Sequence, residues 1–84
     1  MDEKMLSLIG LLIARLERIS ADSFWAHRAS GVKGSLQRLL EKSEKGHHVR
    51  ETDLKHMVDL GFFILEMAAK EKTTKKVVEL KRML

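Results

Sequence analysis

Apolar residues recur at helical spacing over three stretches of this chain. In residues 3–19 they fall three or four positions apart, which predicts an amphipathic first helix that ends near Ser20. A side-chain oxygen of Asp22 or Ser23 would cap a second helix, and a link this short returns that helix antiparallel to the first. The apolar positions of the first helix are Met5, Leu8, Ile9, Leu12, Ile13, Leu16 and Ile19.

The second stretch, residues 23–45, contains Gly31 and Gly34, yet its apolar face keeps one helical phase through both. This pattern predicts one continuous helix, with Gly46 in the position that ends it. A glycine inside a helix costs up to about 1 kcal/mol relative to alanine, so these two positions are where a kink could form. The apolar face consists of Trp25, Ala29, Val32, Leu36, Leu39 and Leu40.

A third helix is expected to begin with Thr52 as its cap, and Thr73 and Thr74 are expected to interrupt it. Val77, Leu80 and Leu84 would then form a short fourth helix or a loosely held extension. The sequence therefore predicts an all-α fold, an antiparallel helical bundle of three long helices plus a short C-terminal helical segment, as a single domain over residues 1–84. The expected core is Met5, Ile9, Leu12, Leu16, Trp25, Val32, Leu36, Leu39, Leu54, Met57, Ile64 and Leu65.

The strongest functional signal is a second apolar stripe on the third helix. Leu60, Phe63 and Met67 lie nearly opposite its core face, which is formed by residues such as Leu54 and Ile64, and His56 extends the stripe toward the helix start. A helix with two apolar stripes needs two partners, so we expect an interface here, most simply a homodimer. Two alternatives are cover by the C-terminal segment, or a different protein or apolar ligand.

The length of 84 residues is near the lower end of what folds unaided, and such chains usually need a disulfide, a metal or a partner. The sequence has no cysteine, so disulfides and thiolate metal sites are excluded, which fits a reducing cytoplasm. The apolar run Met5–Ala14 is about half the length needed to span a bilayer, and it follows acidic residues. We therefore expect a cytoplasmic protein without a membrane segment.

The net charge of +4 is confined to the end of the chain. Residues 1–69 carry ten basic and ten acidic side chains, so residues 70–84 form a basic C-terminal segment on a neutral body. This segment is the basis of an alternative function, nucleic-acid binding, which would weaken steeply with salt. The candidate nucleic-acid contacts are Lys70, Lys72, Lys75, Lys76, Lys81 and Arg82.

The segment SGVKGS, residues 30–35, allows three interpretations. It does not match a phosphate-binding loop, because only two residues separate its glycines and no strand pattern precedes it. It resembles a helix-turn-helix in its Gly-Val turn, but the register is one residue short and His27 occupies the position that needs a small side chain. We favour close helix packing, with Ala26, Ser30 and Gly34 as a close-packing strip.

Sites for catalysis and metal binding have little support in the sequence. Ser30 or Ser35 with His27 as a base would still lack an oxyanion hole and a third orienting group, so we expect no enzyme activity. The histidines at 47, 48 and 56 lie near Glu51 and Asp53, but their spacing matches no helical pair of zinc ligands. We expect solvated loop histidines and neither a metal nor a cofactor.

Overall fold

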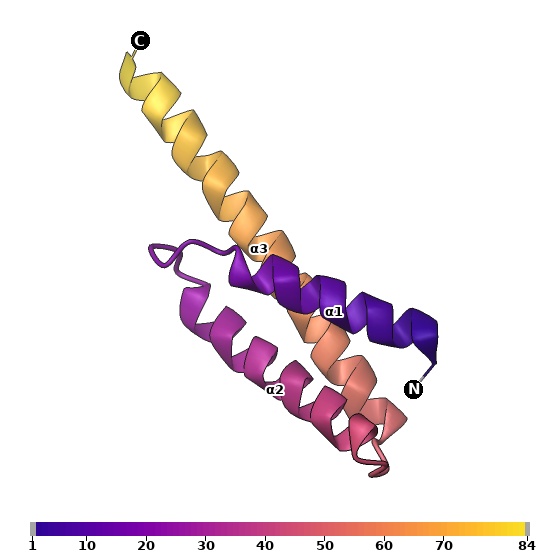
Figure 1. Cartoon of the computed structure of the whole chain (residues 1–84). Helices are drawn as coiled ribbons and strands as arrows, with labels where there is room; N and C mark the ends of the chain where they lie inside the picture. The colour runs from indigo at the N-terminus through magenta and orange to yellow at the C-terminus, as the bar shows by residue number, and fades with distance from the viewer. Residues whose placement is uncertain (1, 84) are drawn as a thin grey trace.

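The computed structural model describes residues 2–83, which form three helices: α1 (Glu3–Glu17), α2 (Ala26–Glu44) and α3 (Glu51–Met83). α1, α2 and the first part of α3 pack as a bundle in which α2 runs antiparallel to the other two, and the rest of α3 projects beyond it (Figure 1). The projection gives the molecule an elongated shape of 58 × 20 × 18 Å. The predicted all-α class is confirmed.

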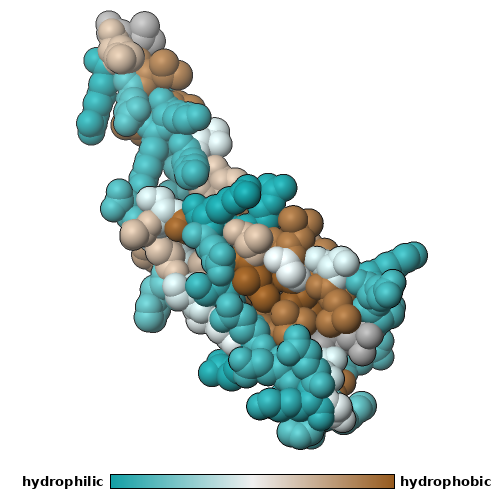
Figure 2. Space-filling view, in the orientation of Figure 1, coloured by the Kyte–Doolittle hydropathy of each residue, from teal (hydrophilic) through white to brown (hydrophobic). Residues whose placement is uncertain are grey.

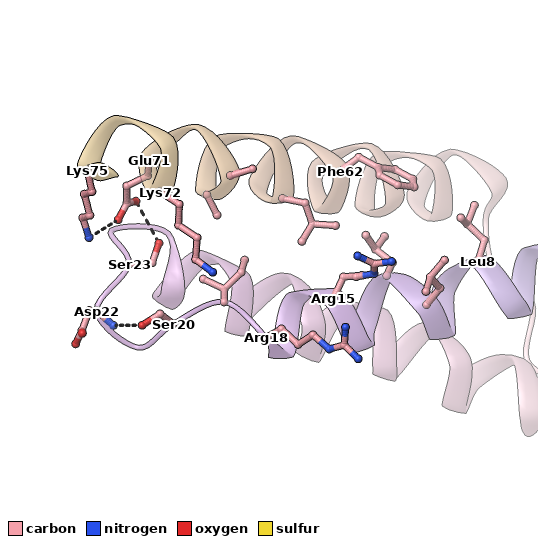
Figure 3. A pocket seen from close by; sticks show the side chains of 16 residues that line it. Leu8, Arg15, Arg18, Ser20, Asp22, Ser23, Phe62, Glu71, Lys72 and Lys75 are labelled. Carbon is pink, nitrogen blue, oxygen red and sulfur yellow. Dashed lines mark hydrogen bonds and ion pairs between the residues drawn. The ribbon is translucent and has the colours of Figure 1, made fainter. Parts of the chain in front are cut away.

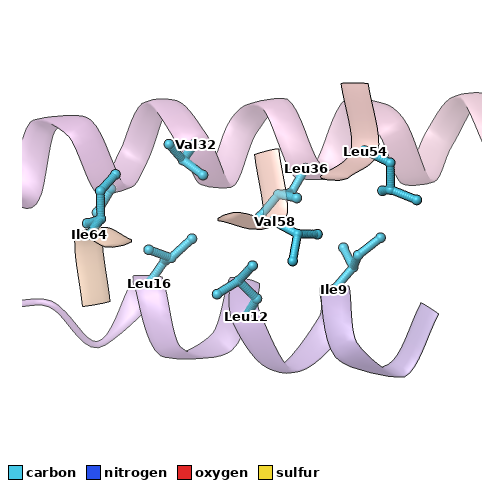
Figure 4. Close-up of a cluster of buried hydrophobic side chains, with 9 residues drawn as sticks. Ile9, Leu12, Leu16, Val32, Leu36, Leu54, Val58 and Ile64 are labelled. Carbon is cyan, nitrogen blue, oxygen red and sulfur yellow. The ribbon is translucent and has the colours of Figure 1, made fainter. Parts of the chain in front are cut away.

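The core lies where the apolar faces of the three helices meet (Figure 4). Ile9 and Leu12 of α1, Leu36 of α2 and Ile64 of α3 are buried to 1% exposure or less. Seven of the twelve expected core residues are buried, and Met5, Trp25, Leu39, Met57 and Leu65 are half-buried around them. The structure adds Ala29, Val58 and Ala68 to the buried apolar residues.

The helix ends follow local hydrogen bonding. Asp2 caps α1, since its Oδ1 accepts a hydrogen bond from the Met5 amide at 2.8 Å. α2 ends at Glu44, and Gly46 follows it in the predicted stop position, where its positive φ of 77° turns the chain and the amides of Gly46 and His47 donate to carbonyls of the last turn. The two predicted caps are wrong: α2 begins at Ala26 without a side-chain cap in the described structure, and Thr52 lies inside the first turn of α3.

α2 runs unbroken through Gly31 and Gly34, so the continuous helical phase is confirmed. The expected interruption at Thr73 and Thr74 is wrong, because α3 continues through both residues to Met83. Each threonine hydroxyl donates a hydrogen bond to the carbonyl four residues earlier, at 3.2 and 3.0 Å. The hydroxyls are therefore hydrogen-bonded within the helix and do not disrupt it. No separate fourth helix exists within residues 2–83; Leu84, named with the predicted segment, lies outside them.

α1 and α3 approach each other closely at Gly61. A Cβ atom added at this glycine would lie 2.8 Å from Cδ2 of Leu12 and 3.1 Å from its Cγ. Real Cβ atoms do not come this close to a neighbour, so the absence of a side chain at Gly61 is what allows Leu12 to pack onto the α3 backbone. This contact fixes the spacing between α1 and α3.

Candidate association surface on α3

The second apolar stripe of α3 lies on the surface of the bundle. Phe63 is 45% exposed, Leu60 and Met67 are half-buried, and His56 is exposed. Leu60 packs against the core with its inner side, and the ring of Phe63 meets the ring of Trp25 edge-on at a centroid distance of 5.8 Å. We call Leu60, Phe63 and Met67 the α3 stripe.

An aromatic cluster on the loop before α2 adjoins the α3 stripe. Phe24 packs edge-on against Trp25 at 5.5 Å and is 80% exposed, the most exposed aromatic ring among the described residues. The guanidinium of Arg28 lies over the Trp25 ring at 5.5 Å, a distance typical of a cation–π contact. The sequence did not predict Phe24 as part of this surface. Phe24 precedes α2, so helical periodicity does not indicate which way its side chain packs.

The C-terminal part of α3 does not cover the α3 stripe, so the intramolecular alternative is wrong. Because α3 is one continuous helix, residues 72–83 run straight out of the bundle and every one of them is exposed (Figure 1). We call residues 72–83 the α3 extension. Its own apolar side chains, Val77, Val78, Leu80 and Met83, also remain exposed.

Glu71 makes the last side-chain contact between α3 and the rest of the bundle. Its carboxylate accepts hydrogen bonds from the Ser23 hydroxyl at 3.2 Å and the Phe24 amide at 3.3 Å, and it pairs with Lys75 at 3.1 Å. Partial desolvation alone would raise the pKa of this carboxyl, but the hydrogen bonds from Lys75, Phe24 and Ser23 together lower it below its ordinary value. Glu71 thus fastens the loop before α2 to the base of the α3 extension.

The basic residues of the C-terminal segment are exposed but do not share one face. Lys70 pairs with Glu66 at 3.2 Å and Lys75 with Glu71, so two of the six cations are partly neutralised. At 100° per residue, Lys72, Lys75, Lys76 and Arg82 lie within about 120° of one another around the helix, whereas Lys70 and Lys81 lie on the other side. A nucleic-acid backbone would therefore meet only part of this charge at a time.

The predicted close-packing strip does not bring two helices together within the described structure. Ser30 is exposed, and a Cβ added at Gly34 would meet no atom within 4 Å. Ala26 and Ser30 instead line a hollow of about 380 Å³ beside the end of α1, because α1 stops at Glu17 and the chain turns away. The glycine that permits close packing is Gly61 of α3, where an added Cβ would meet Leu12.

The residues considered for metal binding form no cluster within residues 2–83, whereas two of those considered for catalysis line the same hollow. His47 and His48 lie exposed in the loop after α2, and His56 is exposed on α3. Within residues 2–83 no three His, Cys, Asp or Glu side chains are close enough together to hold a metal ion. His27 and Ser30 line the hollow beside α1, whereas Ser35 is not among the residues that line it.

No protein-family model, curated protein or solved structure matches this chain. Across the part of the chain that the structure describes, no helix combines the length and apolar character needed to cross a bilayer.

Proposed function

We propose that this protein is a small helical association module that forms a homodimer through the α3 stripe. The observation that carries the proposal is the exposure of Phe63 in the middle of a stripe that the α3 extension leaves uncovered. Monomeric proteins rarely leave contiguous apolar patches open to water, and aromatic anchors are typical of interface centres. A chain this short also gains stability from association, because its own core is small.

The spacing along α3 suits pairing with a second helix. From the α3 stripe, steps of three and four residues continue in both directions, which is the repeat that keeps one helix face against a partner helix. A two-fold symmetric dimer would therefore bring two α3 helices side by side, each using the same residues. The positions on this face are His56, Leu60, Phe63, Met67, Lys70, Thr74, Val77 and Lys81.

Charge favours an antiparallel arrangement of the two helices. If Phe63 lies on the two-fold axis, residues 67–75 of one copy face residues 51–59 of the other. The first range carries three lysines and one glutamate, a net charge of +2, and the second carries three acidic residues and one lysine, a net charge of −2. In the antiparallel dimer these opposite charges would attract each other. In a parallel dimer each segment would face the same segment of the other copy, and the like charges would repel.

The expected contribution of Phe63 follows from its exposure. An aromatic side chain buries about 150–250 Å² when covered, so the exposed 45% of Phe63 leaves roughly 90 Å² to be removed from water. At about 25 cal/mol per Å², this area is worth about 2 kcal/mol for each copy. Phe63→Ala should therefore weaken the dimer by about 30-fold or more in dissociation constant.

The experiment is sedimentation equilibrium over a range of concentrations on the wild type, Phe63→Glu and Phe62→Glu. Phe62 is a matched control, because it is the neighbouring residue, is 48% exposed and lies on the opposite flank of α3. We expect a dimer for the wild type and for Phe62→Glu, and a folded monomer for Phe63→Glu. The proposal is wrong if Phe63→Glu keeps the wild-type mass, or if the wild type is a monomer at all concentrations.

A second candidate, nucleic-acid binding, is favoured by one observation: the α3 extension projects into solvent with five basic residues and one acidic residue. Binding through this segment should weaken steeply as salt is raised, because it would release counterions from the phosphates. A chain truncated after Ala69 should no longer bind a DNA or RNA duplex. Unchanged binding by the truncated chain would contradict this candidate.

A further inference from the structure

An open apolar groove runs between α1 and α3 (Figure 3). It has a volume of about 720 Å³ and is lined by α1, the loop that follows it and α3. Leu8 and Leu11 form the wall from α1, and Phe62, Leu65 and Ala69 form the wall from α3. Figure 2 shows apolar surface gathered over α1 and the bundled part of α3, whereas the extension is mainly polar.

Both walls of this groove carry positive charge. Arg15 and Arg18 line the α1 side, nearer Phe62, and Lys72 and Lys75 line the α3 side near the base of the α3 extension, beside the carboxylates of Asp22 and Glu71 (Figure 3). Glu71 is already engaged by Lys75, Ser23 and Phe24. Arg15, Arg18 and Lys72 take part in none of the ion pairs found within residues 2–83. The groove therefore combines an apolar floor with positive charge on both walls, from Arg15 and Arg18 on the α1 side and Lys72 on α3.

We propose that this groove docks an acidic amphipathic helix of a partner protein. Its apolar face would lie on Leu11 and Phe62, and its carboxylates would meet Arg15, Arg18 and Lys72. From Phe62 to Lys75 the α3 wall is about 20 Å long, which matches a partner helix of about 13 residues. A helix laid between α1 and α3 would complete a four-helix arrangement with the three that are present.

The shape of the groove favours a helix over a small molecule. Small-molecule sites usually enclose most of the ligand surface, but here Leu11 is 55% exposed and Phe62 is 48% exposed, so the groove is open along its length. A small apolar ligand would keep one side in water. A helix brings its own polar face, which remains solvated while its apolar face is covered.

Charge disfavours a second copy of this chain as the occupant. The exposed helical segment that a copy could offer is the α3 extension, with five basic residues and one acidic residue. This segment would bring like charge to Arg15, Arg18 and Lys72. An acidic helix would bring charge opposite to that of the groove. Carboxylates in the first turn of such a helix would also stabilise it, because the N-terminal end of a helix dipole is positive.

The α3 extension can lengthen the same contact. Phe62, Ala69, Thr73 and Leu80 lie within about 40° of one another around α3, so the groove-facing side continues past the bundle. A partner helix longer than the groove would cover Leu80, which is otherwise exposed. Binding of the partner would then give the isolated end of α3 a neighbour to pack against.

The test uses a designed peptide of about 14 residues, with leucines at helical spacing on one face and glutamates elsewhere, titrated against the full chain by fluorescence anisotropy. One control peptide has lysine in place of every glutamate, and a second has the acidic composition with its leucines spread around the helix. We expect binding by the first peptide only, with an affinity that falls at least tenfold between low and high salt.

Two pairs of variants locate the site. Phe62→Glu should weaken binding of the acidic peptide at least tenfold, whereas Phe63→Glu, on the α3 stripe, should leave it unchanged. Arg15→Glu combined with Lys72→Glu should weaken it similarly, whereas Lys81→Glu, outside the groove, should change it less than twofold. Circular dichroism of each variant serves as the control that the helices remain formed.

Several results would overturn the inference. Equal binding of the acidic and lysine peptides would show apolar adhesion without charge recognition, and equal binding of the rearranged acidic peptide would show charge attraction without a groove. Loss of binding in Phe63→Glu but not in Phe62→Glu would move the site to the α3 stripe. Phe62-dependent binding of a long-chain carboxylate or of anionic lipid vesicles, without peptide binding, would assign the groove to a lipid. None of these results depends on whether the chain is a dimer.

Discussion

Gly61→Ala is the substitution that most directly tests how α1 and α3 pack. Within residues 2–83, Gly61 is the one glycine at which an added Cβ would meet another atom within 4 Å. Those atoms belong to Leu12, which is 1% exposed and part of the buried core cluster. The methyl group of an alanine at 61 would overlap the Leu12 side chain at 2.8 Å, so Leu12 or the whole of α1 must move outward.

Two opposing effects determine the size of the change. Replacing a glycine by alanine inside a helix stabilises that helix by up to about 1 kcal/mol. Forcing an extra methyl group into a packed core costs about 1–3 kcal/mol, and the buried position of Leu12 places this site toward the upper part of that range. We therefore expect Gly61→Ala to lower the free energy of unfolding by about 1 kcal/mol net.

Gly31→Ala is the matched control. Gly31 also lies inside a helix, but it is exposed and an added Cβ would meet no atom within 4 Å. This change should raise the free energy of unfolding by about 0.5–1 kcal/mol, because only the helix preference remains. The two substitutions are chemically identical, so the difference between them isolates the Leu12 contact at about 2 kcal/mol.

The assay is urea denaturation followed by circular dichroism at 222 nm, a wavelength that reports helix content, with every variant at the same low concentration. A fixed concentration is needed because association would stabilise the folded state by mass action. The reasoning is refuted if Gly61→Ala stabilises the protein as much as Gly31→Ala does. That result would mean that α1 and α3 do not approach closely at Leu12.

Two further predictions concern the junction between the bundle and the α3 extension. The lowered pKa of Glu71 means that its contribution to stability is present above the ordinary glutamate pKa and is lost as the pH falls through the lower folded-state pKa. The difference in melting temperature between the wild type and Glu71→Gln should therefore shrink as the pH is lowered from 7 to about 3, and a constant difference would contradict this. Truncation after Lys75 should leave the melting temperature of dilute protein within about 2 °C of the wild type, because the residues removed are exposed. It should also remove the trypsin cleavage that the wild type shows after Lys76, Lys81 and Arg82. A larger loss of stability would show that the extension packs on the bundle.

Much of the fold follows from local patterns in the sequence. The spacing of Ile9, Leu12 and Leu16 assigns the inner face of α1, and the constant phase from Ala29 to Leu36 predicts that α2 continues through its glycines. Both patterns depend only on the 3.6-residue period of a helix. The end of α2 is equally local, because Gly46 has the backbone freedom that the stop requires.

Thr73 and Thr74 show where local propensity was misleading. Threonine disfavours helix interiors in part because its hydroxyl competes for backbone groups. In α3 each of these hydroxyls bonds to the carbonyl one turn earlier, so the helix keeps all its bonds and continues. The consequence is large, because an unbroken α3 carries residues 72–83 away from the α3 stripe instead of over it.

The tertiary structure decided which surfaces are open. Phe62 and Phe63 are adjacent and nearly equally exposed, and the sequence identified only Phe63 as a surface residue, because Leu60 and Met67 share its phase. Phe62 became part of a groove only because α1 packs beside it at the distance that Gly61 permits. Helical periodicity determines which residues share a face, but which faces stay uncovered depends on where α1 and α2 pack around α3. Contacts between residues far apart in the chain, such as Leu12 and Gly61, set that placement, and local sequence patterns do not encode such contacts.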